Sequence, residues 1–288
     1  MLITILEAIL LGIIQGAAEF IPVSSSAHLI IVPWLFGWTD PALTSLPFDV
    51  ALHLGTLIAV VVFFIQDWVR LIKAWFASVF QFRIAGDPDR RMAWFVLLGT
   101  IPGAIAGVLF ESKINDLFHK PGAPIDPRAM IVMAAILAGL GLLLWAADRF
   151  TRHQEGMGQI RLPQTLIIGL AQALAIFPGV SRSGSTITTG LALGLKRETA
   201  ARFSFLLSAP IIAGAGLKSL YDIYKGLQSG AIARADLVLF PIGVIAAAIT
   251  GWLCIRFMLN YVQKHSYNVF AYYRFALAAL IVVVALVR

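Results

Sequence analysis

The stretch QGAAEFIPVSSSAH, Gln15 to His28, interrupts an apolar run with a carboxylate, a proline, three serines and a histidine. A charged side chain inside a bilayer is costly, so an acidic residue or an imidazole there indicates a functional site with a polar partner. Pro22 ends or kinks a helix, and a serine after it can cap the next helix. The stretch therefore predicts two helices joined by a polar turn within a membrane.

The composition supports a membrane location. The chain has 288 residues, of which 59% are hydrophobic and 13% charged, whereas a soluble domain carries about 25% charged residues. We expect an all-α, polytopic membrane protein that forms one membrane domain over residues 1–288. Six apolar blocks are near spanning length: 47–66, 93–110, 129–147, 203–217, 238–258 and 270–287.

Two further apolar regions, 5–34 and 164–195, are broken in the middle by proline, serine and glycine. Each divides into pieces of roughly ten to fifteen residues, which is too short to span a bilayer. We expect both regions to form re-entrant helical hairpins, because irregular backbone at membrane depth is tolerated only where protein or a cavity surrounds it.

The two hairpins are related in sequence. A shift of 157 positions aligns residues 12–28 with 169–185, and seven of the seventeen pairs are identical. We interpret this as an internal duplication, with repeats at about 1–147 and 160–288. Three predicted spans separate the hairpins, so the second enters from the opposite face. That arrangement is an inverted repeat, which places sites near the bilayer midplane.

The formal charge of +7 could suggest a nucleic-acid partner, but the basic residues lie mainly in short loops between apolar blocks. The positive-inside rule explains them, so we expect no nucleic-acid binding. No Lys or Arg precedes Arg70, and the next loop holds five basic residues including Arg70. We therefore place that loop in the cytoplasm, and both termini and the mouth of the first hairpin on the outer face.

The first hairpin offers acid, base and nucleophile. Gln15 and Glu19 are four residues apart and share a helix face, and His28 lies three residues after Ser25. Glu19, Ser25 and His28 could converge at the turn. Asp49 and His53, four apart in the next apolar block, are a candidate pair that supports Glu19 or His28.

The second hairpin, FPGVSRSGSTITTG, offers an anion site. A glycine-containing turn before a helix N-terminus binds anions, and Arg182 adds a planar positive group that suits phosphate oxygens. The candidate phosphate-binding residues are Gly179, Ser181, Ser183 and Thr186.

Together these groups fit phosphoryl transfer, which needs a positioned attacking oxygen and neutralised phosphate charge. Ser25 could attack directly, deprotonated by His28 or Glu19. Alternatively, an activated water attacks and Ser25 only holds the phosphate. Gln15 and Glu19 could also hold Mg²⁺ or Ca²⁺ against a pyrophosphate. A transporter or flippase for an anionic lipid or solute is the rival reading, because such proteins share inverted repeats but need no nucleophile.

The segments QGAAE, FIPVSSSAH and PGVSRSGST resemble those of the undecaprenyl-pyrophosphate phosphatase family, also called the bacitracin-resistance protein family. The resemblance covers essentially the whole chain. It implies a multi-pass protein of the bacterial inner membrane that converts undecaprenyl pyrophosphate to the monophosphate carrier of peptidoglycan synthesis, with an active site open to the periplasm. A homodimer is left open.

The resemblance also implies catalytic roles for Glu19, Ser25, His28 and Arg182. Ser181 and Thr186 would support them. Family members often have glutamate where this chain has Gln15. That departure removes one charge from any metal site and gives Glu19 more weight.

Overall fold

The computed structural model describes residues 2–118, 127–229 and 237–287, and within these ranges every regular element is a helix. This confirms the all-α prediction. The α-helices are α1 (Leu2–Phe20), α2 (Ser25–Phe36), α3 (Leu46–Phe63), α4 (Ile65–Phe80), α5 (Pro88–Phe118), α6 (Pro127–Phe150), α7 (Leu162–Ala173), α8 (Arg182–Ala192), α9 (Arg197–Ser229), α10 (Leu239–Lys264) and α11 (Asn268–Val287). Two short 3₁₀ helices are η1 (Met157–Gln159) and η2 (Leu174–Ile176).

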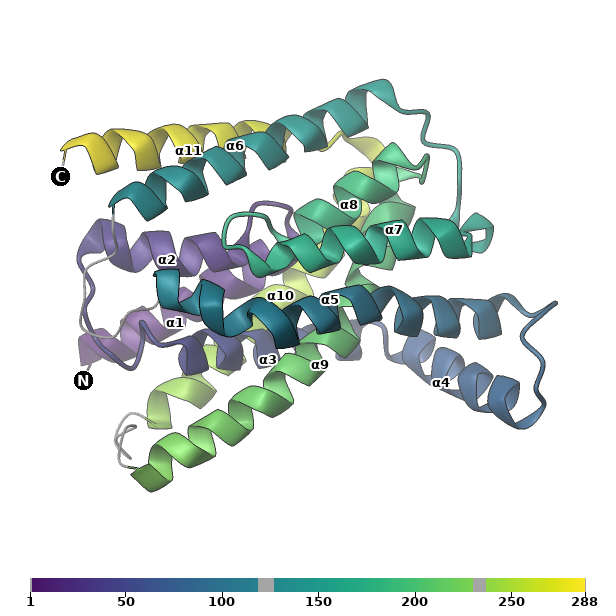
Figure 1. Ribbon diagram of the computed structural model, residues 1–288, viewed down its shortest axis with the longest axis horizontal. Helices are drawn as coiled ribbons and strands as arrows, with labels where there is room; N and C mark the ends of the chain where they lie inside the picture. The colour runs from purple at the N-terminus through teal and green to yellow at the C-terminus, as the bar shows by residue number, and fades with distance from the viewer. Residues whose placement is uncertain (1, 119–126, 230–236, 288) are drawn as a thin grey trace.

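Seven helices of the described ranges are long and apolar enough to cross a membrane. Six of them, α3, α5, α6, α9, α10 and α11, coincide with the six predicted apolar blocks, although the block 47–66 runs three residues beyond the end of α3. The seventh is α1, whose 19 residues exceed the length expected for half a hairpin. The chain turns back after α1, however, and α2 returns toward the end of the molecule where the N-terminus lies (Figure 1).

The two broken regions enter the helical bundle from opposite ends. Helices α1 and α2 come from the end where both chain termini lie, whereas α7 and α8 come from the other end (Figure 1). Both hairpins turn in the middle of the bundle, where their turns face each other. This is the arrangement that the odd number of intervening spans predicts.

The two turns share one backbone conformation. Ser24 and Ser181, which the sequence alignment pairs, are the N-caps of α2 and α8 and have positive φ angles of 78° and 68°. The Ser24 hydroxyl accepts a hydrogen bond from the Ala27 amide at 3.4 Å, and the Ser181 hydroxyl accepts one from the Gly184 amide at 3.0 Å. Positive φ is uncommon for residues other than glycine. Its recurrence at paired positions supports an ancestral duplication.

A glycine at the same repeat position lets the first helix of each hairpin pack closely against a neighbouring helix. A Cβ at Gly12 of α1 would clash with the carbonyl oxygen of Gly243 in α10, and a Cβ at Gly169 of α7 would clash with that of Gly99 in α5. Small residues allow such close approach between membrane helices. Because Gly12 and Gly169 are also aligned in the repeat, we propose two repeats at about 1–147 and 160–288 within one membrane domain.

Helix α4 occupies the segment that we expected to be a basic loop. Its exposed apolar side chains recur at helical spacing, and Leu71 and Ser78 of its opposite face are buried. Such an amphipathic helix suits a membrane interface. Attention to the Lys and Arg residues alone misses this periodicity. The exposed apolar side chains include Ile65, Val69, Ile72, Phe76 and Phe80.

Candidate active site

The turns of the two hairpins contact each other directly. An Arg182 side-chain nitrogen lies 3.1 Å from Glu19 Oε1, and the Ser183 hydroxyl donates to the carbonyl oxygen of Ile21 at 3.3 Å. The Phe20 ring, beside Glu19, packs edge-on against Phe205 of α9 at 5.2 Å between centroids. The contact therefore joins the C-terminal end of α1 to the start of α8 inside an apolar shell.

Glu19 is the centre of this contact. Its carboxylate is only 5% exposed. Oε2 accepts hydrogen bonds from the Ser25 hydroxyl at 2.6 Å and the Gln15 amide at 3.0 Å, and it lies 3.4 Å from His53 Nε2. Oε1 accepts the bond from Arg182. A buried carboxylate needs such donors, because its water shell is lost.

Ser25 and Arg182 occupy equivalent positions in the two repeats. Each is the first helical residue after a capping serine, so each side chain starts from the same turn geometry. Both bind the Glu19 carboxylate, one on each oxygen. Arg182 also donates to the carbonyl oxygen of Ser204 at 2.9 Å, and its buried Nε has no hydrogen-bond partner within the described ranges. The structure thus brings three of the four predicted catalytic residues together.

His28 lies nearby but its ring nitrogens contact other groups. Nδ1 is 2.6 Å from the carbonyl oxygen of Ser24, and Nε2 is 2.7 Å from the Tyr273 hydroxyl. In this state neither nitrogen is available to Ser25. Of the two candidate bases, only Glu19 accepts a hydrogen bond from Ser25 in this structure.

The predicted phosphate-binding residues are buried and hydrogen-bonded within the protein. Ser181 caps α8, and Ser183 reaches the first turn. The Thr186 hydroxyl donates to the Arg182 carbonyl oxygen at 2.8 Å and is 2.7 Å from the Ser204 hydroxyl. Gly179 has a φ of +97°, which suits glycine. These residues hold the Arg182 turn in shape, whereas Arg182 itself offers the charge.

Arg274 of α11 was not predicted, although it contacts both turns. It is 1% exposed, and it donates to the carbonyl oxygens of Pro22 at 3.1 Å, Gly179 at 2.8 Å and Leu137 at 3.0 Å. One guanidinium thus ties the first turn, the second turn and α6 together. Arg274 lies in the apolar block 270–287, so the rule that flags charges inside membrane segments would have found it.

The side chains near Glu19 can also be compared with the ligands that a metal site needs. Among the described residues, no three His, Cys, Asp or Glu side chains gather as a metal cage. His53 Nδ1 meets the backbone carbonyl oxygen of Asp49 at 2.7 Å, and its Nε2 faces Glu19. Gln15 Oε1 is buried and has no hydrogen-bond partner in the part of the chain that the structure describes. A free amide oxygen beside a carboxylate fits Mg²⁺ or Ca²⁺ only if substrate oxygens complete the coordination.

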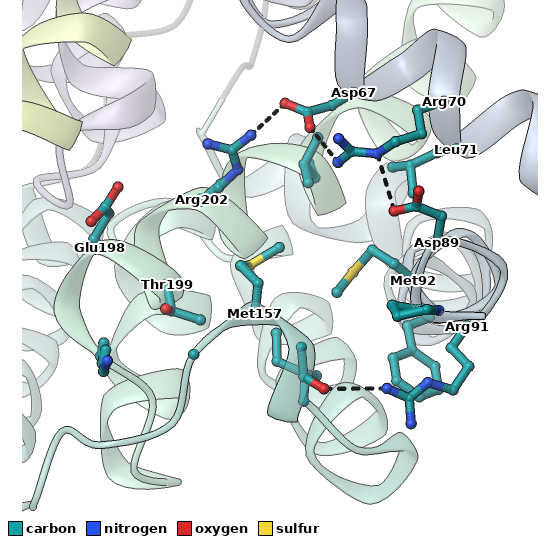
Figure 2. Close-up of a pocket in the computed structure, with 17 residues that line it drawn as sticks. Asp67, Arg70, Leu71, Asp89, Arg91, Met92, Met157, Glu198, Thr199 and Arg202 are labelled. Atoms are coloured by element: carbon teal, nitrogen blue, oxygen red, sulfur yellow. Dashed lines mark hydrogen bonds and ion pairs between the residues drawn. The ribbon is translucent and has the colours of Figure 1, made fainter. Parts of the chain in front are cut away.

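A cavity of about 520 Å³ lies elsewhere, between the starts of α4, α5 and α9 (Figure 2). Four of its charged side chains form ion pairs. Asp67 binds Arg70 at 2.7 Å and Arg202 at 2.6 Å, and Asp89 binds Arg70 at 3.0 Å. None of the residues around Glu19 lines this cavity. We therefore propose the hairpin contact, and not this cavity, as the reaction site.

The fold and the site define a multi-pass membrane protein with a serine, a carboxylate and an arginine buried between two hairpin turns. The family model of the bacitracin resistance protein BacA matches residues 8–280, and the chain belongs to this family. It is 45% identical to an undecaprenyl-diphosphatase of Thermomicrobium roseum over 96% of this chain and 97% of the relative. It is 46% identical to one of Moorella thermoacetica over 99% of both chains.

Proposed function

We propose that this protein hydrolyses undecaprenyl pyrophosphate to undecaprenyl phosphate and inorganic phosphate, and so recycles the lipid carrier of peptidoglycan synthesis. The names of its relatives support this activity over transport. One observation links this activity to particular residues. The Ser25 hydroxyl donates a 2.6 Å hydrogen bond to one carboxylate oxygen of Glu19, and the other oxygen binds Arg182. A transport site needs the positive charge but no nucleophile.

We propose that Ser25 attacks the terminal phosphorus. As the bond between Oγ and phosphorus forms, the hydroxyl proton passes to Glu19 Oε2, and the bond from phosphorus to the bridging oxygen breaks. Undecaprenyl phosphate leaves with the bridging oxygen. Arg182 turns from Glu19 toward the phosphate, where its planar group stabilises charge on the phosphoryl oxygens.

Water then cleaves the phosphoserine. The water oxygen bonds to phosphorus and the bond from phosphorus to Ser25 Oγ breaks. Glu19 returns the proton it accepted to Oγ, and both water protons leave on inorganic phosphate. Direct attack by water on the substrate, with Ser25 only holding the phosphate, is the competing route. The two routes differ in one intermediate, which acid-quenched protein would retain on Ser25.

We propose that Gln15 Oε1 and Glu19 hold a divalent cation together with pyrophosphate oxygens. Such an ion would neutralise phosphate charge when bound. Gln15 is neutral, so the protein supplies a single carboxylate to this ion, and the substrate must supply most of the remaining charge.

We propose that the site opens to the periplasm and that both termini lie there. The basic segment from Arg70 to Arg91 supports this orientation through the positive-inside rule. Figure 1 places both termini at the end from which α1 and α2 enter, opposite the α4–α5 turn.

Phosphate release from a polyprenyl pyrophosphate by the detergent-purified protein tests the proposal. Glu19→Gln and Arg182→Ala should each lower kcat by ~10²-fold or more, because they remove a proton acceptor and a charge-stabilising donor. Arg83→Ala, in an exposed segment, is the control and should keep the full rate. Full turnover in both site variants would refute the residue assignment, and an inactive wild type would refute the activity.

A further inference from the structure

Helix α11 contacts the first hairpin through two adjacent residues, Tyr273 and Arg274. The Tyr273 hydroxyl is 2.7 Å from His28 Nε2, and the two rings are nearly parallel, with 11° between their planes and 5.7 Å between centroids. Tyr273 is 46% exposed and His28 is 8% exposed. Tyr273 therefore lies against a buried His28 ring and is itself partly exposed.

The contacts define the protonation of a neutral His28 ring. The carbonyl oxygen of Ser24 can only accept, so Nδ1 at 2.6 Å carries the hydrogen. Nε2 is then an acceptor, and the Tyr273 hydroxyl donates to it. Without that hydroxyl, Nε2 would be a buried acceptor with no partner among these contacts.

The Ser24 carbonyl oxygen connects this pair to the nucleophile. It accepts from Nδ1 of His28 and also from the His28 backbone amide at 3.2 Å. Ser24 has a φ of 78°, a conformation that costs free energy and persists only where surrounding contacts hold it. Ser25 follows directly, so the Ser24 peptide sets the direction of its hydroxyl toward Glu19.

We propose that Tyr273 is a positioning residue for the reaction. Its hydroxyl fixes the His28 ring, the ring fixes the Ser24 carbonyl, and that carbonyl fixes the turn that presents Ser25. This inference rests on the proposed phosphatase function. Tyr273 itself does not touch the reacting atoms.

Tyr273→Phe tests the proposal, with the neighbouring Tyr272→Phe as the matched control. Tyr272 is 57% exposed, and no side-chain hydrogen bond involves it among the described contacts. We expect Tyr273→Phe to lower kcat by ~10-fold, the equivalent of one hydrogen bond to a buried group, with KM nearly unchanged. Tyr272→Phe should match the wild type. Equal rates in the two variants would overturn the proposal.

A double-mutant cycle with His28→Asn separates positioning from general packing. If Tyr273 acts through His28, Tyr273→Phe should cause no further loss in a His28→Asn background. If the double variant instead shows the product of the two single-variant losses in kcat, the proposal is overturned.

The Nε2 resonance of His28 in ¹⁵N-labelled protein, assigned by its absence in His28→Asn, provides a readout without substrate. Its chemical shift should change in Tyr273→Phe and stay at the wild-type value in Tyr272→Phe. An unchanged chemical shift in Tyr273→Phe would also overturn the proposal. If the wild type releases no phosphate, the proposed function fails, whereas this resonance still tests the contact.

Discussion

Replacing Arg274 by methionine should loosen the junction of the two hairpins. The guanidinium donates three hydrogen bonds of 2.8–3.1 Å to carbonyl oxygens in the first turn, the second turn and α6. Methionine retains most of the side-chain volume but donates no hydrogen bond. All three carbonyl oxygens would then lack this donor at a depth where water does not replace it.

The magnitude follows from those three acceptors. Each buried acceptor left unpaired costs about 1–3 kcal/mol, so the loss is roughly 3–9 kcal/mol. Replacing the buried charge also removes its desolvation cost, which offsets the loss by several kcal/mol. We expect a net destabilisation of about 3 kcal/mol. Arg274→Lys should be intermediate, because a single ammonium keeps the charge but cannot match the planar fork.

Thermal unfolding of the detergent-solubilised protein measures the effect. Arg274→Met should lower Tm by roughly 6–12 °C on the scaling of domains of this size class. Arg256→Met is the control, because Arg256 is exposed on α10 and, among the described residues, it lies over the Trp252 ring without forming a hydrogen bond or ion pair. An Arg274→Met protein that unfolds at the wild-type temperature would refute the reasoning.

Three further predictions follow from the site and its packing. Ser25→Ala should lower phosphate release by ~10²-fold or more, whereas Ser26→Ala, at the neighbouring hydroxyl, should stay within a few-fold, and similar rates would exclude Ser25. Gly12→Ala should cost about 1–3 kcal/mol of unfolding free energy because its Cβ meets the backbone of α10, whereas Gly139→Ala, with open space around it, should not destabilise. Chelation should abolish turnover and Mg²⁺ or Ca²⁺ restore it, and Gln15→Glu should lower the metal concentration required; activity in excess chelator would exclude the metal.

The sequence predicts the hairpins because their signals are local. Pro22 and the serines mark the first break within a few residues, and the 157-residue shift pairs Ser24 with Ser181. The six apolar blocks are likewise local signals, because an apolar run near spanning length indicates a membrane helix without information from the rest of the chain. Proximity of Glu19 to Arg182 agrees with the proposed inverted repeat, because hairpins inserted from opposite faces can bring their turns together near the midplane.

Other features depend on contacts that no local pattern encodes. His28 and Tyr273 are far apart in the chain, so spacing alone favours a partnership of His28 with Ser25 that the structure does not form. Ser181 and Thr186 have the composition of an anion cradle, yet folding uses their hydroxyls for capping and packing. Side-chain type predicts which chemistry is available, whereas tertiary contacts decide which groups remain free for it.

A structure of the protein with vanadate, which mimics a phosphoryl group in transfer, tests the central claim most directly. The account predicts one vanadate at the hairpin contact, within bonding reach of Ser25 Oγ and about 3 Å from the Arg182 guanidinium, with Arg182 released from Glu19. Vanadate bound instead in the Asp67–Arg202 cavity, with the Glu19–Arg182 pair intact, would contradict it.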